Sequence, residues 1–78
     1  MNTNLDYALQ VLKIAGQCKG MMADLSNNEG HGYCISYQPR VEHGKPIKSC
    51  TVIFLDRATA ESDLVNAIAE LSGILAAQ

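Results

Sequence analysis

The sequence predicts a single α+β domain with the order helix, strand, strand, helix, and two observations lead to this class. Two stretches with helical spacing of apolar residues, about 4–25 and 59–76, flank a central segment in which β-branched and aromatic residues recur at every second position. The central segment divides into strands of about 32–38 and 47–55, joined across a connection with glycine at its centre. We therefore expect an antiparallel hairpin packed on two helices in a two-layer domain.

The first helix is predicted over 4–25. Thr3 can cap it, and Asp6 stands three residues later, where a capping box places its carboxylate. Polar residues recur three or four positions apart and form one narrow stripe, so most of the circumference is expected to be buried. An alternative is that Gly20–Met22 marks a kink or an early end of this helix. The polar stripe consists of Asp6, Gln10, Lys13, Gln17 and Asp24.

The hairpin register follows from placing His43 and Gly44 at the turn, because glycine tolerates the positive φ of a tight hairpin turn. Glu42 then faces Lys45 as an opposite-charge pair. Side chains alternate between faces along a strand, so one face collects the apolar residues and is expected to be buried. In this register the facing pairs on that side are Tyr37 with Cys50, Ile35 with Val52, and Tyr33 with Phe54.

The second helix is predicted over 59–76, with Thr59 as its cap and with Glu61 and Asp63 in its first turn, where carboxylates favour the helix dipole. Its apolar face is also broad. Two strands alone are marginally stable in water, and a hairpin on two helices leaves strand edges open. A symmetric homodimer is therefore expected, formed by joining sheet edges or by packing helices, and the broad apolar faces favour the helices.

Composition narrows the class of protein further. Hydrophobic residues make up 47% and charged residues 18% of the 78 residues, which argues against disorder. A formal net charge of -2 gives no bulk attraction for nucleic acid. No long apolar run predicts a membrane span, and no basic segment followed by an apolar run predicts a signal peptide. Three cysteines, an odd number, fit reduced thiols in the cytoplasm, where we expect the protein to act.

Catalytic and metal-binding patterns are weak. Thiolate and imidazole are ligands for zinc, but their spacing here forms no paired-cysteine motif, so neither a metal site nor any other cofactor is predicted. The carboxylates fall on polar helix stripes, and no glycine-rich phosphate loop follows a strand, so no enzyme is predicted. The residues weighed as zinc ligands are Cys18, His31, Cys34, His43 and Cys50.

Two sets of residues are candidates for binding. Arg40, His43, Lys45 and Lys48 cluster at the hairpin connection, and a basic β-ribbon tip can contact phosphates. Tyr7 lies at the margin of the first helix and is an amphipathic side chain of the kind that anchors protein interfaces. The first set points to nucleic acid, the second to protein.

The leading hypothesis is a non-enzymatic, homodimeric protein–protein adaptor or inhibitor. The alternative is a nucleic-acid-binding regulator that uses the connection Arg40–Lys48. In its small size and lack of catalytic motifs, the chain is similar to accessory proteins of phages and other mobile elements, which often bind a host protein. The similarity lies in size and composition and involves no shared motif, and it implies that the chain binds a protein.

Overall fold

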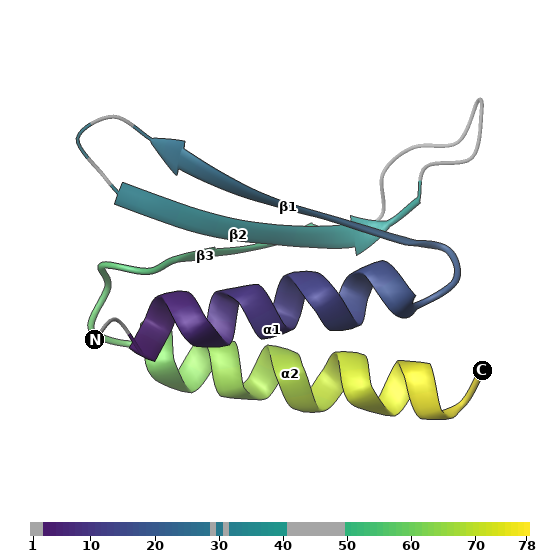
Figure 1. Ribbon diagram of the computed structural model, residues 1–78. Coiled ribbons are helices and arrows are strands. Elements are labelled where there is room, and N and C mark those ends of the chain that lie inside the picture. Colours follow the sequence, from purple (N-terminus) through teal and green to yellow (C-terminus); the bar gives the residue numbers. More distant parts are fainter. Residues whose placement is uncertain (1–2, 29, 31, 41–49) are drawn as a thin grey trace.

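A computed structural model describes residues 3–28, 30, 32–40 and 50–78. These residues form an antiparallel three-stranded sheet in the order β1-β2-β3, with both helices on one of its faces (Figure 1). The two-layer α+β arrangement predicted from the sequence is confirmed, with one strand more than expected. The elements are α1 (Thr3–Gln17), β1 (Met21–Asn28), β2 (Gly32–Pro39), β3 (Thr51–Phe54) and α2 (Ala60–Ala76).

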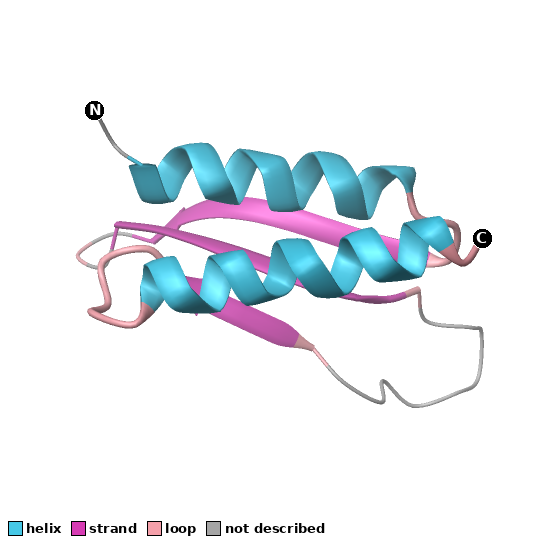
Figure 2. Cartoon of the chain, turned by 90° about the horizontal axis from the view of Figure 1, so that it is seen from below, coloured by secondary structure: helices cyan, strands magenta, loops and turns pink. Residues whose placement is uncertain are grey.

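The two helices lie side by side and run in the same direction, as both views show (Figures 1 and 2). Their first turns meet near the end of β3, where the Asn4 side-chain Nδ2 donates to the Leu55 carbonyl at 3.0 Å. Their last turns are joined by Gln78, whose Oε1 accepts from the Lys19 amide at 2.8 Å and whose Nε2 donates to the Lys19 carbonyl at 3.0 Å. Each end of the helix pair is therefore fixed by side-chain to backbone hydrogen bonds.

The first helix is shorter than predicted: it ends at Gln17 rather than at residue 25, and residues 21–28 form strand β1. Gly20 has a φ of +76°, a conformation that interrupts a right-handed helix. Beyond it, Ala23 and Leu25 pack toward the helices, whereas Asp24 between them is exposed. The alternative of an early helix end at Gly20–Met22 is the correct one.

The predicted hairpin register is wrong by one residue. Ile35 pairs with Ile53 instead of Val52, and Phe54 pairs with Cys34 instead of Tyr33. Tyr37 likewise pairs with Thr51 instead of Cys50. The predicted pair Glu42–Lys45 and residues 47–49 lie outside the described residues.

Burial explains which register the sheet adopts. Ile53 and Leu55 of the β3 segment are buried against the helices, while Val52 is 49% exposed. The predicted register would have placed Val52 in the core and both larger, buried side chains outside it. On β2 the prediction holds for Ile35 and Tyr37, which are buried as expected, and fails for Tyr33, which is 43% exposed.

The core lies between the sheet and the helix pair, with Ile35 of the central strand fully buried. Ala8 and Ala15 are also fully buried on α1, and their small side chains allow close approach of neighbouring elements. Large exposed apolar side chains on the helices are limited, in the described part, to Leu9 and Val65. The remaining fully buried large side chains are Val11, Leu64 and Leu71.

The second helix begins at Ala60, and Thr59 occupies the cap position as predicted. The Thr59 hydroxyl does not bond to a backbone amide; it donates to the Asp63 carboxylate at 3.1 Å. Neither described helix is both long enough and apolar enough to cross a membrane.

Candidate functional site

Both described helices cover the same face of the sheet, and we call the other face the open face. Side chains alternate along each strand, so every second residue of β1, β2 and β3 projects on this side. Met22 and Val52 are 44% and 49% exposed and stand on the two outer strands, β1 and β3. The open face is formed by Met22, Asp24, Ser26, Cys34, Ser36, Gln38, Val52 and Phe54.

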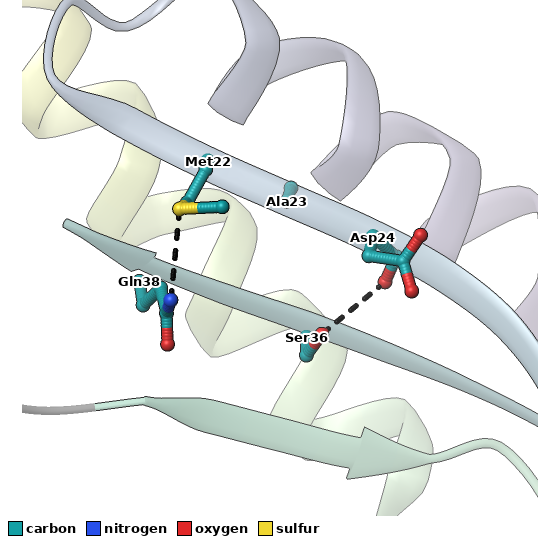
Figure 3. Close-up of a pocket in the computed structure, with 5 residues that line it drawn as sticks. All are labelled: Met22, Ala23, Asp24, Ser36 and Gln38. Atoms are coloured by element: carbon teal, nitrogen blue, oxygen red, sulfur yellow. Dashed lines mark hydrogen bonds between the residues drawn. The ribbon is translucent and has the colours of Figure 1, made fainter. Parts of the chain in front are cut away.

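A shallow depression of about 170 Å³ lies between β1 and β2 on the open face (Figure 3). Two polar contacts shape it: Gln38 Nε2 donates to the Met22 sulfur at 3.6 Å, and Ser36 Oγ donates to the Asp24 carbonyl at 3.5 Å. A pocket that encloses a drug-sized ligand typically has about 300–1,000 Å³. The depression is too small for that, and its chemistry suits single side chains. The residues lining it are Met22, Ala23, Asp24, Ser36 and Gln38.

The opposite end of the open face is more apolar. Cys34 is only 6% exposed there, because Ser26 on one side and Phe54 on the other are its cross-strand neighbours. The Ser26 hydroxyl lies 3.2 Å from the Cys34 sulfur. The guanidinium carbon of Arg57 lies 4.9 Å from the centre of the Phe54 ring, within the range of a cation–π interaction.

On the helix side of the sheet, Tyr37 connects β2 with α2. Its ring is buried and its hydroxyl donates to the Glu70 carboxylate at 3.2 Å. Burial raises the pKa of the Tyr37 hydroxyl above 10.0; the Glu70 charge and hydrogen bond act the same way, and a hydrogen bond with Thr51 opposes them. The contact fixes the sheet on the helix layer, on the side opposite the open face.

Of the predicted binding residues, Arg40 and Tyr7 lie within the described ranges, and they stand on different elements. Arg40 is exposed just after β2, and its amide donates to the Gly20 carbonyl at 2.7 Å. Tyr7 is half-buried and packs against the core, in the first half of α1. Because α1 rises about 1.5 Å per residue, the stretch from Tyr7 to Gln17 alone spans roughly 15 Å. The other predicted residues, His43, Lys45 and Lys48, lie outside the described residues.

The weighed metal ligands are likewise dispersed where the structure describes them. Cys18 is buried and its thiol donates to the Leu71 carbonyl at 3.6 Å, whereas Cys50 is exposed. Within the described ranges, no three His, Cys, Asp or Glu side chains are close enough to hold a metal ion together. His31 and His43 are outside those ranges.

Sequence reasoning missed the residues of β1, which contribute Met22 and Asp24 to the open face. A signal was present, since Gly20 interrupts the helical pattern and Ala23 and Leu25 then alternate with the polar residues Asp24 and Ser26. In the predicted long helix, Asp24 belonged to a solvated stripe; in the sheet it stands beside the depression on the outermost strand.

No protein-family model, no curated protein and no solved structure matches this chain.

Proposed function

We propose that this chain is a non-enzymatic protein that binds another protein, as an adaptor or inhibitor, through the open face. The observation that supports this proposal is that one face of the sheet is packed on two helices while the other carries Met22 and Val52, each nearly half exposed. Exposed apolar side chains grouped on one face of a small protein are typical of interaction surfaces.

The chemistry of the open face favours a protein partner over a small ligand. Its outer strands carry the apolar residues Met22, Val52 and Phe54, and its central strand carries the hydroxyl and amide groups of Ser36 and Gln38. Interfaces that form and dissociate combine apolar contacts with hydrogen-bonding groups in this way. The depression of about 170 Å³ can take one side chain of a partner.

The placement of the carboxylates supports a role in binding. Asp6 and Asp24, which sequence reasoning put on polar stripes, are both exposed, and so are Glu61, Asp63 and Glu70. A carboxylate that acts as a general acid or base usually has its pKa shifted by an apolar pocket. Exposed carboxylates on separate elements are instead suited to surface contacts.

We also propose that the protein forms a symmetric homodimer, as a pair of helix layers or of sheets. The sequence predicts a dimer from the broad apolar surfaces of its helices. Part of that surface belongs to strand β1 in the structure. What supports the dimer in the fold is the open face together with Leu9 and Val65 on the helices, 47% and 45% exposed. Sedimentation equilibrium tests this proposal: a species of 8.4 kDa at millimolar concentration would refute it.

Affinity capture from an extract of the native host tests the binding proposal. The bait carrying Met22→Gln with Val52→Thr loses the apolar side chains of the open face, and both residues are exposed enough for the fold to persist. The control, Tyr33→Gln, changes a residue that is 43% exposed and projects from the opposite face of the sheet. We expect wild type and control to capture the same protein and the open-face variant to capture at least tenfold less. Equal capture by all three baits would refute the open face as the binding surface.

A nucleic-acid-binding function is the second candidate, and the exposed guanidinium of Arg40 at the end of β2 favours it. Binding through Arg40 and the connection that follows would weaken with salt, because cations that contact phosphates release counterions. A gel-shift assay with duplex and single strands, repeated with Arg40→Ala combined with Lys45→Ala, tests it. Absence of any shift at low salt would exclude this function.

A further inference from the structure

The alternation of hydrogen-bonded and non-hydrogen-bonded residue pairs in the sheet identifies which backbone groups of β1 face outward. The Arg40 amide bonds to the Gly20 carbonyl, so residues 20 and 40 form a hydrogen-bonded pair. In an antiparallel ladder such pairs alternate with non-hydrogen-bonded pairs. Asp24 therefore directs its amide and carbonyl toward Ser36 of β2, whereas Ala23 and Leu25 direct theirs to the outer edge.

The hydrogen bonds between β2 and β3 follow the same alternation. The Leu55 amide bonds to the Tyr33 carbonyl, so odd-numbered residues of β2 bond to β3 and its even-numbered residues bond to β1. The backbone groups of Ala23, Leu25 and Asn27 thus point outward along an edge strand of 8 residues. No strand of the described residues pairs with this edge. An uncapped edge of this length is a template for a further strand.

Asp24 lies on the edge strand, where a strand added to β1 would meet its charge. Its side chain is exposed on the open face, no described residue forms an ion pair with it, and its carboxylate points away from Ser36 (Figure 3). It is the one charged residue among the eight of the open face. A residue opposite Asp24 on an added strand would form a non-hydrogen-bonded pair, with Cα atoms about 4.5 Å apart and side chains in close contact.

A second copy of this chain offers Asp24 no basic partner at this edge, because β1 contains no lysine or arginine. When two β1 strands pair antiparallel about a twofold axis, Asp24 faces Asp24 of the other copy if the axis lies at Asp24, and faces Ser26 if it lies at Leu25. Like charges directly opposite each other across strands are destabilising. Charge complementarity instead favours a strand that presents lysine or arginine at this position.

We propose that the outer edge of β1 binds an extended segment of another protein as a fourth, antiparallel strand, with a basic residue of that segment opposite Asp24. The backbone groups of Ala23, Leu25 and Asn27 supply the hydrogen bonds. The Asp24 carboxylate and the depression beside it, between Met22 and Gln38, select the long basic side chain. This mode of recognition, in which main-chain bonds give affinity and alternate side chains give specificity, is strand addition. The inference rests on the proposed protein-binding function and names its contact.

Two fluorescent ten-residue peptides of alternating threonine and valine test the pairing, one with a central lysine and one with glutamate in its place. We expect saturable anisotropy with the lysine peptide and binding up to about fivefold weaker with the glutamate peptide. Asp24→Lys should reverse this preference, and Asp24→Asn should abolish it. Binding that shows no preference in wild type, or an unchanged preference in Asp24→Lys, would overturn the proposal.

Two variants at Ala23 test the edge. Proline is tolerated on an edge strand where the amide faces solvent, so Ala23→Pro blocks the β1 edge without removing a ladder bond to β2. Ala23→Ser is the matched control, because it changes the same position and keeps the outward amide. Circular dichroism should show both variants folded. Peptide binding should be lost in Ala23→Pro and kept in Ala23→Ser; unchanged binding in Ala23→Pro would overturn the proposal.

The same variants separate this inference from the proposed function. If Ala23→Pro still captures the host protein that the open-face variant loses, protein binding stands and strand addition is wrong. If Ala23→Pro converts a dimer into a monomer in sedimentation, the edge is occupied by a second copy, which also overturns the proposal. Loss of both peptide binding and host capture in Ala23→Pro, with the oligomeric state unchanged, is the expected result.

Discussion

The Tyr37 hydroxyl of β2 donates to the Glu70 carboxylate of α2 at 3.2 Å, across 33 residues of sequence. The tyrosine ring is 5% exposed, while Glu70 lies at the surface of the helix. The contact joins the central strand to the helix that follows the last strand, so it can form only when both layers are assembled. It is therefore a local reporter of the packing between sheet and helices.

Tyr37→Phe should destabilise the fold by about 1 kcal/mol. The substitution keeps the buried ring and removes the hydrogen bonds of the hydroxyl with Glu70 and Thr51. Glu70 is exposed to water, which places the loss at the lower end for bonds to charged groups. Urea unfolding followed by circular dichroism measures it. Tyr33→Phe is the control, because Tyr33 is 43% exposed, and it should change the free energy of unfolding by less than about 0.5 kcal/mol. Equal effects of the two substitutions would contradict the role of the Tyr37 contact.

Stability should also fall at alkaline pH through the same residue. Burial raises the pKa of Tyr37 in the folded state above 10.0, so the folded protein holds this proton more tightly than the unfolded chain does. The contribution is fully present below pH 10 and is lost as pH rises through the raised pKa of the folded state. Urea midpoints measured between pH 8 and pH 11 (about 2 units below to 1 unit above the ordinary tyrosine pKa) should converge for wild type and Tyr37→Phe. A gap between the two that is constant across this range would refute the assignment.

The observed hairpin register and the register derived from the turn predict opposite effects of substitutions at Ile53 and Val52. Ile53 is 5% exposed, so Ile53→Ala should destabilise by about 2–5 kcal/mol through lost burial and a residual cavity. Val52→Ala changes a side chain that is 49% exposed and should cost less than about 1 kcal/mol. The alternative register buries Val52 instead and predicts the opposite order. Urea titration of the two variants therefore distinguishes the registers.

The sequence predicted the fold class and the second helix because those depend on long, strongly periodic segments. It did not predict β1, because Met21, Met22, Ala23 and Leu25 satisfy a helical apolar pattern as well as an alternating one. Only the positive φ of Gly20 decides between them, and a glycine is also compatible with a weakened helix. The candidate site was missed for the same reason, since Asp24 joins the open face only once β1 is a strand.

The one-residue error in the hairpin has a different cause. The turn was placed from a short local signal at His43 and Gly44, whereas the register is set by which residues fill the core. Ile53 and Leu55 bury more apolar surface than Val52 could with its neighbour Cys50. Distant packing therefore decided the pairing, and no pattern within the connection reveals that outcome.

The Gln78 side chain should protect the end of α1 from local opening. It accepts from the Lys19 amide at 2.8 Å and donates to the Lys19 carbonyl at 3.0 Å, although the site is exposed. Gln78→Ala should cost at most about 1 kcal/mol, because water replaces both bonds. Hydrogen exchange at the Lys19 amide should accelerate severalfold in the variant while exchange at Ile35 is unchanged. Uniform acceleration at both amides would show a global effect instead.

Substitutions at Gly16 and Gly20 test whether the backbone conformation of Gly20 ends the helical segment. Gly20 has a φ of +76°, and no heavy atom lies within 4 Å of where a Cβ would be, so Gly20→Ala is opposed by backbone strain alone. It should destabilise the fold by about 1 kcal/mol or more. Gly16 lies within α1, also in open space, and Gly16→Ala should stabilise by up to about 1 kcal/mol through helix propensity. The two substitutions are chemically identical and four residues apart, so opposite shifts in the thermal midpoint would reflect conformation alone. If Gly20→Ala also raised the midpoint, the helix would continue past residue 17 and β1 would not form as described.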